Sequence, residues 1–456
     1  SRYGLCMKRF LANRIGGALA LLVIASSPPA SAQDHWPQFR GADSLGVSAN
    51  RNLPEKWSTT ENVEWKQDLP GRGWSCPIVW GDRIFLTTVI NDGETESAKK
   101  GLYFGGERPK FPDTVHQWKV YCLDLKSGKI RWEKEVHKGK PQSAIHVKNS
   151  YASETPVTDG ERVYCYFGNV GVFVFDLDGN PQWSKKFTPH KTRHSWGTAA
   201  SPVLHKDRLY ILNDNEVESS LLALDTKTGD QVWKIVRDEK SNWSNPFIWK
   251  NKMRTEIVVS GTGRTRSYDL NGKELWSYKG MSSITIATPY ASDGLLYISS
   301  GYVGDRKKPI YAIRPGASGD ISLVPLKGTS GEFIAWCNWK ASPYNPSTLI
   351  YDKQLYSLLD RGWIRTLDPK TGAYIYEGKR LPPGAGYTVS PWAYNGKVFC
   401  LNEDGETHVL KAGREFELLH TNKLAEDDMA MACPAMAGDR LLIRTAARVY
   451  CIRNSK

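Results

Sequence analysis

Short runs of alternating apolar and polar residues recur along the chain, and each run ends in a turn. The clearest copy is 221–233, LLALDTKTGDQVW, in which an apolar run reaches Asp225, a turn closes on Gly229, and a short second run carries Trp233. Alternation with a period of two predicts a half-buried β-strand, and Gly supplies the positive φ that a tight turn requires. The pattern therefore predicts a β-hairpin whose aromatic residue packs on a neighbouring copy.

The same hairpin pattern appears at four other places. The copies are 121–132 (YCLDLKSGKIRW), 174–183 (VFDLDGNPQW), 267–276 (SYDLNGKELW) and the weaker 365–376 (RTLDPKTGAYIY), which has Tyr376 in place of Trp. Because an isolated hairpin is only marginally stable, the copies are expected to stack on one another.

A small or polar residue followed by Pro marks the start of each repeat. The eight dipeptides are Cys76-Pro77, Thr155-Pro156, Ser201-Pro202, Asn245-Pro246, Thr288-Pro289, Asn345-Pro346, Ser390-Pro391 and Cys433-Pro434. Most intervals are about 44 residues, which is typical of a β-propeller blade with four short strands. Insertions near 90–117 and 316–340 account for the two longer intervals.

The last repeat ends at ARVYCIRNSK without a tryptophan strand, and the stretch NVEWKQDL around Trp65 supplies one near the other end of the chain. We therefore predict an all-β fold: an eight-bladed β-propeller of four-stranded antiparallel blades, with the ring closed by the N-terminal strand. Closure of this kind removes an exposed sheet edge.

The Asp-x-x-Thr-Gly-x-x-x-Trp pattern of 225–233 resembles the tryptophan-docking repeat of the pyrroloquinoline-quinone (PQQ) propellers. That superfamily includes quinoprotein alcohol dehydrogenases and the propeller lipoprotein of the outer-membrane assembly machine. The segment 35–48, HWPQFRGADSLGVS, resembles secreted PQQ-like repeat proteins of planctomycete-type bacteria. The resemblance covers essentially all of 33–456 and implies the fold more strongly than an activity, because this fold serves both enzymes and scaffolds.

The first 32 residues are typical of a targeting segment. After Met7 come basic residues, the apolar run 15–25 and Ala30-Ser31-Ala32, which indicate a signal peptide cleaved before Gln33. An uncleaved membrane anchor is the alternative, although the run is short for a bilayer. We expect residues 1–32 to be upstream residues and signal peptide and 33–456 to be one propeller domain, exported to the periplasm or the cell surface and monomeric, with no transmembrane segment.

Composition narrows the possible partners. The net charge is +13, and acidic residues are interspersed with the basic ones, so the chain shows no stripe for nucleic acid. Seven cysteines follow the predicted cleavage site, so at least one thiol is unpaired. They can be read as small buried apolar residues, or Cys76 and Cys433 could form a bridge between equivalent positions of neighbouring blades.

Propellers usually bind ligands at one mouth of the central channel. The segments that enter each inner strand carry candidate binding residues that could stack a flat quinone, a sugar or a peptide aromatic group; the alternative is that they only fill the funnel. The candidates are Arg72, Trp74, Tyr151, Glu154, Arg193, His194, Trp196, Asn242, Trp243, Trp336, Asn338, Tyr387, Asp427 and Asp428.

The sequence supports an enzymatic activity less well than it supports a binding function. The resemblance implies PQQ held over calcium by Glu and Asn, with a Cys-Cys disulfide against the cofactor, but this chain has no Cys-Cys pair and no Cys-x-x-Cys-His haem motif. Glu154, Asn242, Asn338 and Asp427 are suitable calcium ligands by type, and no hydrolase motif is present. No catalytic or metal-ligating residue is assigned. We expect a binding or scaffolding module for protein segments or envelope polysaccharide, with a PQQ-dependent oxidoreductase as the alternative.

Overall fold

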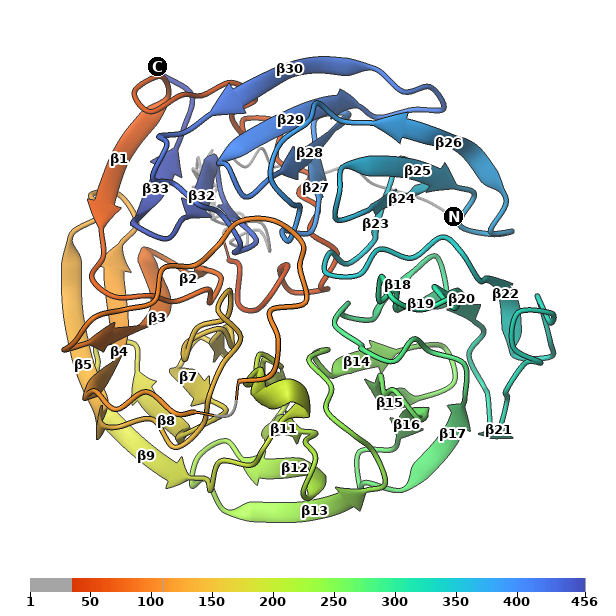
Figure 1. Cartoon of the computed structure of the whole chain (residues 1–456), viewed down its shortest axis with the longest axis horizontal. Helices are drawn as coiled ribbons and strands as arrows, with labels where there is room; N and C mark the ends of the chain where they lie inside the picture. Colours follow the sequence, from red (N-terminus) through yellow and green to blue (C-terminus); the bar gives the residue numbers. More distant parts are fainter. Residues whose placement is uncertain (1–34, 109, 456) are drawn as a thin grey trace, which may run out of the picture. The chain divides into compact units, whose positions relative to one another are not determined.

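The computed structural model describes residues 35–108 and 110–455, which all belong to the unit Gln33–Lys456. The predicted signal peptide lies outside the described residues. Within the unit, eight antiparallel sheets are arranged as blades around a central axis (Figure 1). The prediction of an eight-bladed, all-β propeller is therefore confirmed.

Each blade is a four-stranded meander. Blade 1 contains β2 (Ile78–Trp80), β3 (Arg83–Asn91), β4 (His116–Asp124) and β5 (Ile130–Gly139). Blade 2 contains β6 (Val157–Thr158), β7 (Arg162–Phe167), β8 (Gly171–Asp176) and β9 (Pro181–Lys186). Blade 3 contains β10 (Val203–His205), β11 (Arg208–Asn213), β12 (Ser219–Asp225) and β13 (Gln231–Arg237). Blade 4 contains β14 (Phe247–Lys250), β15 (Thr255–Val259), β16 (Thr265–Tyr268) and β17 (Glu274–Tyr278).

The other four blades follow the same plan. Blade 5 contains β18 (Tyr290–Ser292), β19 (Leu295–Ser299), β20 (Ile310–Ile313) and β22 (Ile334–Asn338). Blade 6 contains β23 (Leu349–Tyr351), β24 (Gln354–Leu358), β25 (Trp363–Leu367) and β26 (Tyr374–Arg380). Blade 7 contains β27 (Trp392–Tyr394), β28 (Lys397–Leu401), β29 (Glu406–Lys411) and β30 (Leu418–Lys423). Blade 8 contains β31 (Ala435–Ala437), β32 (Arg440–Arg444) and β33 (Arg448–Ile452), together with β1 (Val63–Asp68).

The ring is closed by the strand predicted to close it. β1 pairs antiparallel with β33, from Val63 opposite Ile452 to Asp68 opposite Arg448. The pairing places Trp65 on the outer strand of blade 8, where its indole Nε1 donates a hydrogen bond to the Leu125 carbonyl of blade 1 at 2.9 Å. Blade 8 is therefore built from both ends of the propeller domain.

The repeated Asp, Gly and Trp connect each blade to the next. Asp225 accepts hydrogen bonds from the Lys227 and Thr228 amides of its turn, at 2.8 and 3.1 Å. Gly229 has a φ of +75°, and a Cβ placed there would lie 2.4 Å from the ring of Trp183 in blade 2. The Trp183 indole also donates to the Thr226 carbonyl at 2.9 Å. Each docking tryptophan thus lies over the glycine turn of the following blade, as the hairpin pattern predicted.

Blade 4 departs from this rule. Its Trp276 is fully buried and donates to Glu256 of its own blade at 2.7 Å. The short strand β21 (Gly319–Asp320) adds to the outer strand β17 in parallel and makes this sheet five-stranded. The predicted insertion at 316–340 is therefore too long at its C-terminal end, because β22 within it is the regular outer strand of blade 5.

A ring of hydrogen bonds connects the inner ends of the blades. In three successive blades the backbone N–H of Cys76, Thr155 and Ser201 donates to the side chain of the next blade, at 2.9, 2.9 and 2.6 Å. The same link runs from Thr288 to Ser347, from Ser347 to Ser390, from Ser390 to Cys433 and from Cys433 to Cys76. In blade 6 the ring residue is Ser347, two positions beyond the predicted Asn345.

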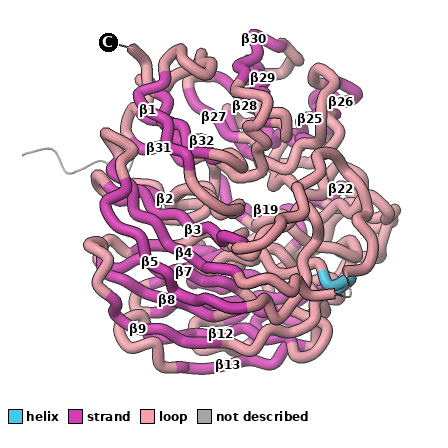
Figure 2. The backbone as a smooth tube through the Cα atoms, turned by 60° about the vertical axis from the view of Figure 1, so that its left-hand side comes forward, coloured by secondary structure: helices cyan, strands magenta, loops and turns pink. Residues whose placement is uncertain are grey.

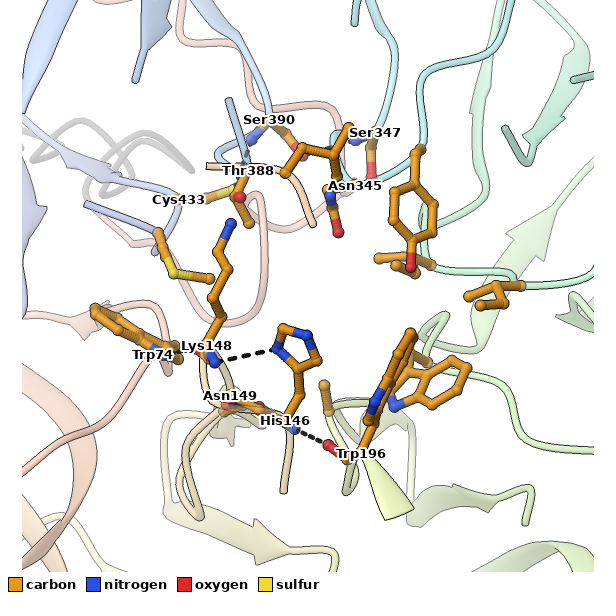
Figure 3. Close-up of a pocket in the computed structure, with 18 of the residues that line it drawn as sticks. Trp74, His146, Lys148, Asn149, Trp196, Asn345, Ser347, Thr388, Ser390 and Cys433 are labelled. Atoms are coloured by element: carbon orange, nitrogen blue, oxygen red, sulfur yellow. Dashed lines mark hydrogen bonds between the residues drawn. The ribbon is translucent and has the colours of Figure 1, made fainter. Parts of the chain in front are cut away.

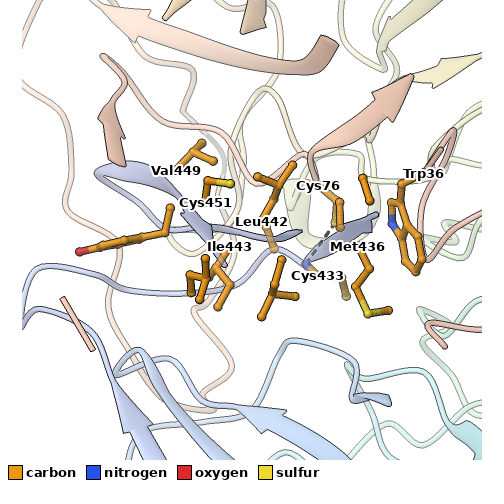
Figure 4. Packing of buried hydrophobic residues seen from close by; sticks show 14 of the residues in the cluster. Trp36, Cys76, Cys433, Met436, Leu442, Ile443, Val449 and Cys451 are labelled. Atoms are coloured by element: carbon orange, nitrogen blue, oxygen red, sulfur yellow. Dashed lines mark hydrogen bonds between the residues drawn. The ribbon is translucent and has the colours of Figure 1, made fainter. Parts of the chain in front are cut away.

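Buried apolar side chains fill the space between adjacent sheets. One cluster joins blades 7, 8 and 1 and includes Trp36, Met436, Leu442 and Ile443 (Figure 4). All seven cysteines of the described residues are buried and free, so the bridge considered between Cys76 and Cys433 is not formed. No helix among the described residues is long and apolar enough to cross a membrane.

Candidate functional site

A pocket of about 460 Å³ lies on the central axis, because every blade contributes to its wall the residue that enters its inner strand. These residues are Cys76, Thr155, Ser201, Asn245, Thr288, Ser347, Ser390 and Cys433. The volume falls within the range of small-molecule sites. Figure 3 shows Trp74, His146 and Trp196 on one side of the space and Asn345, Ser347 and Ser390 on the other.

Three indoles form the aromatic part of the pocket wall. Trp74, Trp196 and Trp243 come from the segments before the inner strands of blades 1, 3 and 4. Their Nε1 atoms donate to the carbonyls of Lys148, Gly106 and Gly197, at 2.7, 2.8 and 2.8 Å. Since each indole N–H already has a partner, the rings offer the pocket their apolar surface.

The long loop 92–115 of blade 1 extends over the mouth of the channel (Figure 1, orange). Its residues Gly101, Leu102, Tyr103 and Phe104 line the pocket. On one side the loop reaches the 3-10 helix η2 (Arg193–Ser195), which lies among the loops of the ring (Figure 2). There the Arg108 N–H donates to the His194 carbonyl at 3.0 Å. The sequence predicted only an insertion near 90–117, and the structure places this loop over the site.

Blade 7 holds the other side of the loop. Glu403, whose side chain is completely buried, pairs with the Lys148 ammonium and accepts a 2.7 Å hydrogen bond from the Gly101 N–H. Lys148 also donates to the Gly101 carbonyl at 2.8 Å, and Thr388 donates to Glu403 at 2.7 Å. A buried, saturated ion pair therefore fixes the loop to the ring.

His146 is the imidazole of the pocket wall. Its Nδ1 accepts from the Lys148 N–H at 3.1 Å, and its ring lies 5.0 Å from that of Trp196 in an edge arrangement. Burial lowers the pKa of His146 to about 4, so this imidazole is neutral at pH 7. It contributes a flat, uncharged surface next to the indole.

The pocket lining contains Lys148, Arg361 and His146 but neither an Asp nor a Glu. No group of three or more His, Cys, Asp or Glu residues is arranged for a metal ion in the part of the chain that the structure describes. A hard divalent cation requires several oxygen ligands, usually with carboxylates among them. The four ligand candidates named above do not come together.

Those four residues have different partners in different blades. Buried Glu154 accepts from the Gly168 N–H at 3.1 Å and from Thr198 at 2.5 Å. Asn242 donates to the Ser260 carbonyl at 2.5 Å. Asn338 is at the end of the outer strand β22, and Asp427 pairs with Arg448 at 3.0 Å.

Several other candidates stand behind the pocket wall. The Arg72 guanidinium donates to the Val147 carbonyl at 3.3 Å, and the Tyr151 hydroxyl to the Ser143 carbonyl at 2.6 Å. Arg193 reaches the Ser283 carbonyl at 2.5 Å, and His194 pairs with Glu107 of the loop. Tyr387 is buried against Gly362. These side chains contact the loops around the pocket and do not line it.

Three candidates are placed differently from the funnel-facing position expected. Trp336 and Asn338 belong to β22, the outermost strand of blade 5, and Trp336 docks on Gly372 of blade 6. The inserted strand β21 obscured this periodicity in the sequence. Asp428 is fully buried within blade 8, where it accepts hydrogen bonds from Tyr450 and Thr445 at 2.6 and 2.8 Å.

Of the predicted candidates, the pocket therefore brings together Trp74, Trp196 and Trp243. Sequence reasoning missed Lys148, Glu403 and the loop residues Tyr103 and Phe104. Lys148 and Glu403 are 255 positions apart, and no local pattern links them. The ring residues themselves carried a signal, because the small-Pro dipeptides marked their positions.

Comparison with known proteins identifies the family. The family model described as "Outer membrane protein assembly factor BamB" matches residues 114–315 and 218–456. The matched ranges span most of the chain, and the chain belongs to this family of PQQ-like β-propellers. No curated protein matches the sequence.

Solved structures of similar fold include a BamB protein and alcohol dehydrogenases. BamB from Moraxella catarrhalis superposes with a TM-score of 0.52 at 12% identity, over 80% of this chain and 99% of that one. A europium-containing methanol dehydrogenase superposes with a TM-score of 0.60 at 11% identity, over 91% of this chain and 90% of that one. The quinohemoprotein alcohol dehydrogenase ADHIIG from Pseudomonas putida HK5 superposes with a TM-score of 0.55 at 12% identity, over 93% of this chain and 81% of that one. At these identities the likeness shows the fold alone.

The quinone cofactor implied by the family resemblance can be tested against this pocket. Its planar ring could contact the indole faces of the wall, but its calcium ion would meet no carboxylate in the lining. Glu403, which contacts the lining residues Lys148, Gly101 and Thr388, is already engaged by them. The residues present do not fit a metal-bound quinone.

Proposed function

We propose that this chain is a binding module of the cell envelope, and that its pocket on the central axis takes an aromatic side chain presented by a protein segment. One observation carries the proposal: three indole faces and two loop aromatics, Tyr103 and Phe104, converge on a pocket without any carboxylate. Aromatic groups pack on one another with specific geometry and a large apolar contact.

Two polar residues of the wall, Asn149 and Thr388, favour an aromatic ligand over a sugar. A sugar needs hydrogen-bond partners for many hydroxyl groups, and unpaired polar groups reduce affinity strongly. Here the Asn149 amide is occupied by the Trp196 and Thr198 carbonyls, at 2.9 and 3.2 Å. Thr388 is occupied by Glu403. These two polar groups of the wall are therefore already engaged within the protein.

A protein partner is supported by the family and by the exposure of the loop. The matching family model describes an outer membrane protein assembly factor, and we infer a protein partner for this chain from that description. Phe104 lines the pocket although half of its surface is exposed. Exposed aromatic groups at the rim of a pocket are typical anchors of protein interfaces.

The alternative is a PQQ-dependent oxidoreductase. It is favoured by the methanol dehydrogenase, of which this chain covers 90%, and it is disfavoured by the missing metal ligands. Calorimetric titration of the purified chain with PQQ, with and without calcium chloride, separates the two functions. Calcium-dependent one-to-one binding would support the enzyme and overturn the binding module; no heat in either condition is the result we expect.

A peptide display library tests the proposed ligand directly. We expect peptides selected on the wild-type chain to share an aromatic residue and to lose at least tenfold in affinity for Trp243→Ala. The matched control is Trp363→Ala, because Trp363 is an exposed tryptophan on β25 outside the pocket. Circular dichroism would confirm that both variants are folded. Selected peptides that bind both variants like the wild type, or a preference for soluble envelope glycan over every peptide, would overturn the proposal.

A further inference from the structure

Two thiols meet at the seam between blade 8 and blade 1. Cys76 precedes the inner strand of blade 1, and Cys433 precedes that of blade 8. The Cys433 N–H donates to the Cys76 sulfur at 3.1 Å (Figure 4). The Cys433 sulfur also accepts from the Ser390 N–H at 3.4 Å. Both sulfurs therefore occupy acceptor positions of the inner ring.

Two buried guanidinium groups flank this pair. Arg40 lies near Cys433, and Arg444 lies near Cys76. Both arginines are 3% exposed. Arg444 donates to the Ser75 and Thr87 carbonyls, at 2.8 and 2.7 Å. Arg40 donates to the Leu45 and Thr348 carbonyls, while its Nε and Nη1 have no partner among the described residues. Neither arginine has a carboxylate beside it.

A buried cation without a counter-ion favours a nearby anion. The acidic groups within reach of Arg40 are the Cys433 thiol and the Tyr290 hydroxyl. The neighbouring Cys76, together with Arg40, lowers the pKa of Cys433, whereas burial raises the pKa of Cys76. One sulfur is thus suited to attack as a thiolate while the other retains its proton.

The thiol pair also faces the central pocket. Cys76 and Cys433 both line the central pocket, whereas the other five cysteines of the described residues do not. Those five lie within strands of the blades. Burial raises the pKa of each of them.

We propose that Cys76 and Cys433 are a redox-active dithiol that exchanges with small disulfides entering the pocket, and that its oxidised form joins blade 1 to blade 8 covalently. The Cys433 thiolate attacks one sulfur of the small disulfide, which forms a mixed disulfide and releases one thiolate. Cys76 then loses its proton and attacks the Cys433 sulfur, which releases the second thiolate. The two thiols of the protein are oxidised, and the small disulfide is reduced to two thiols.

Oxidised glutathione is a suitable probe. The purified chain is incubated with it at pH 7, alkylated under denaturing conditions and mapped by mass spectrometry. We expect the loss of two free thiols per chain and a cross-linked peptide containing Cys76 and Cys433, reversed by dithiothreitol. The oxidised chain should also unfold at a higher temperature, because the new bond closes a long loop. Full alkylation of both residues after incubation would overturn the proposal, as would glutathione retained on Cys433 without a cross-link.

Single variants test the order of attack. Serine is the natural choice because Ser201 and Ser390 hold the same ring position. Cys76→Ser should trap glutathione on Cys433, whereas Cys433→Ser should react at Cys76 at least tenfold more slowly. Cys165→Ser is the matched control, because Cys165 is buried in β7 outside the pocket, and it should cross-link like the wild type. Equal rates for the two ring variants would overturn the assignment of Cys433 as the attacking sulfur.

Discussion

Glu403 of blade 7 pairs with the Lys148 ammonium and accepts a hydrogen bond from the Gly101 N–H, and so fixes the loop 92–115 to blade 7. The carboxylate is fully buried, and the Lys148 side chain is 11% exposed. Removing one member of such a pair leaves an uncompensated charge in the protein interior.

The first prediction concerns this ion pair. Glu403→Gln should lower the free energy of unfolding by roughly 3 to 5 kcal/mol and should increase proteolytic cleavage within 92–108. The neighbouring Asp404→Asn is the control, because Asp404 pairs with Lys100 at the surface and its loss should cost less than about 1 kcal/mol. Urea unfolding and limited proteolysis measure the two effects. Equal cleavage of both variants would contradict the role given to Glu403.

The second prediction concerns the tryptophan docking. Gly229→Ala combines a positive φ with a Cβ 2.4 Å from the Trp183 ring. The backbone conformation costs roughly 1 to 2 kcal/mol, and the overpacking a further 1 to 3 kcal/mol or so. Gly294→Ala isolates the first cost, since Gly294 has a φ of +81° and open space around its Cβ. The melting temperature of Gly229→Ala should therefore be well below that of Gly294→Ala. Equal melting temperatures would show that the contact between Gly229 and the Trp183 ring contributes little to stability.

The third prediction concerns the inner ring of hydrogen bonds. Ser201→Ala removes the acceptor of the buried Thr155 N–H, and an unsatisfied buried donor costs about 1 to 3 kcal/mol. Ser260→Ala is the matched control, because the Ser260 hydroxyl is buried without a partner among the described residues. The Ser260→Ala substitution should leave the free energy of unfolding unchanged or raise it. Chemical unfolding of both variants distinguishes the two cases, and similar losses would argue against a contribution from the ring.

The fourth prediction concerns pH. Burial raises the pKa of Glu154 from 4.5 to about 7, so between these values the folded state binds more protons than the unfolded state. Stability due to this residue is present below pH 4.5, decreases as the pH rises and is fully lost above pH 7. The change amounts to about 3 kcal/mol.

Glu154→Gln should remove this dependence. The unfolding free energy of the wild type relative to the variant should fall by that amount between pH 4.5 and 7.5. Urea titrations at several pH values would measure it. A constant difference across the range would show that the Glu154 carboxyl has an ordinary pKa.

The blades were predictable because each repeat carries its own local chemistry. The Asp225 turn, the Gly229 conformation and the Trp233 strand follow from residues within one hairpin, and the incomplete last repeat required the strand around Trp65. Trp336 was misplaced because β21 interrupts the spacing between a strand and its partner. The path of the loop 92–115 was not predictable, since its contacts with Glu403 and His194 join residues far apart in the sequence.

The candidate site was predictable where it is part of the repeat. Trp74 and Trp243 each stand two positions before a ring residue, and this spacing brought them to the pocket. Glu154, Asn242 and Asp428 are polar residues in similar segments, but the side chain of each is hydrogen-bonded to other groups of the protein. Residue type indicated which side chains could bind a ligand, and only the fold decided which of them face the pocket.

The seam of blade 8 has a consequence for biosynthesis. Asp68 meets Arg448, 380 positions later in the chain, so β1 has no partner until nearly all of the domain has left the ribosome. Pairing over such a separation is slow to form, and an unpaired strand edge favours aggregation in the meantime. We therefore expect a nascent chain of this protein to be prone to aggregation until its last strand is available.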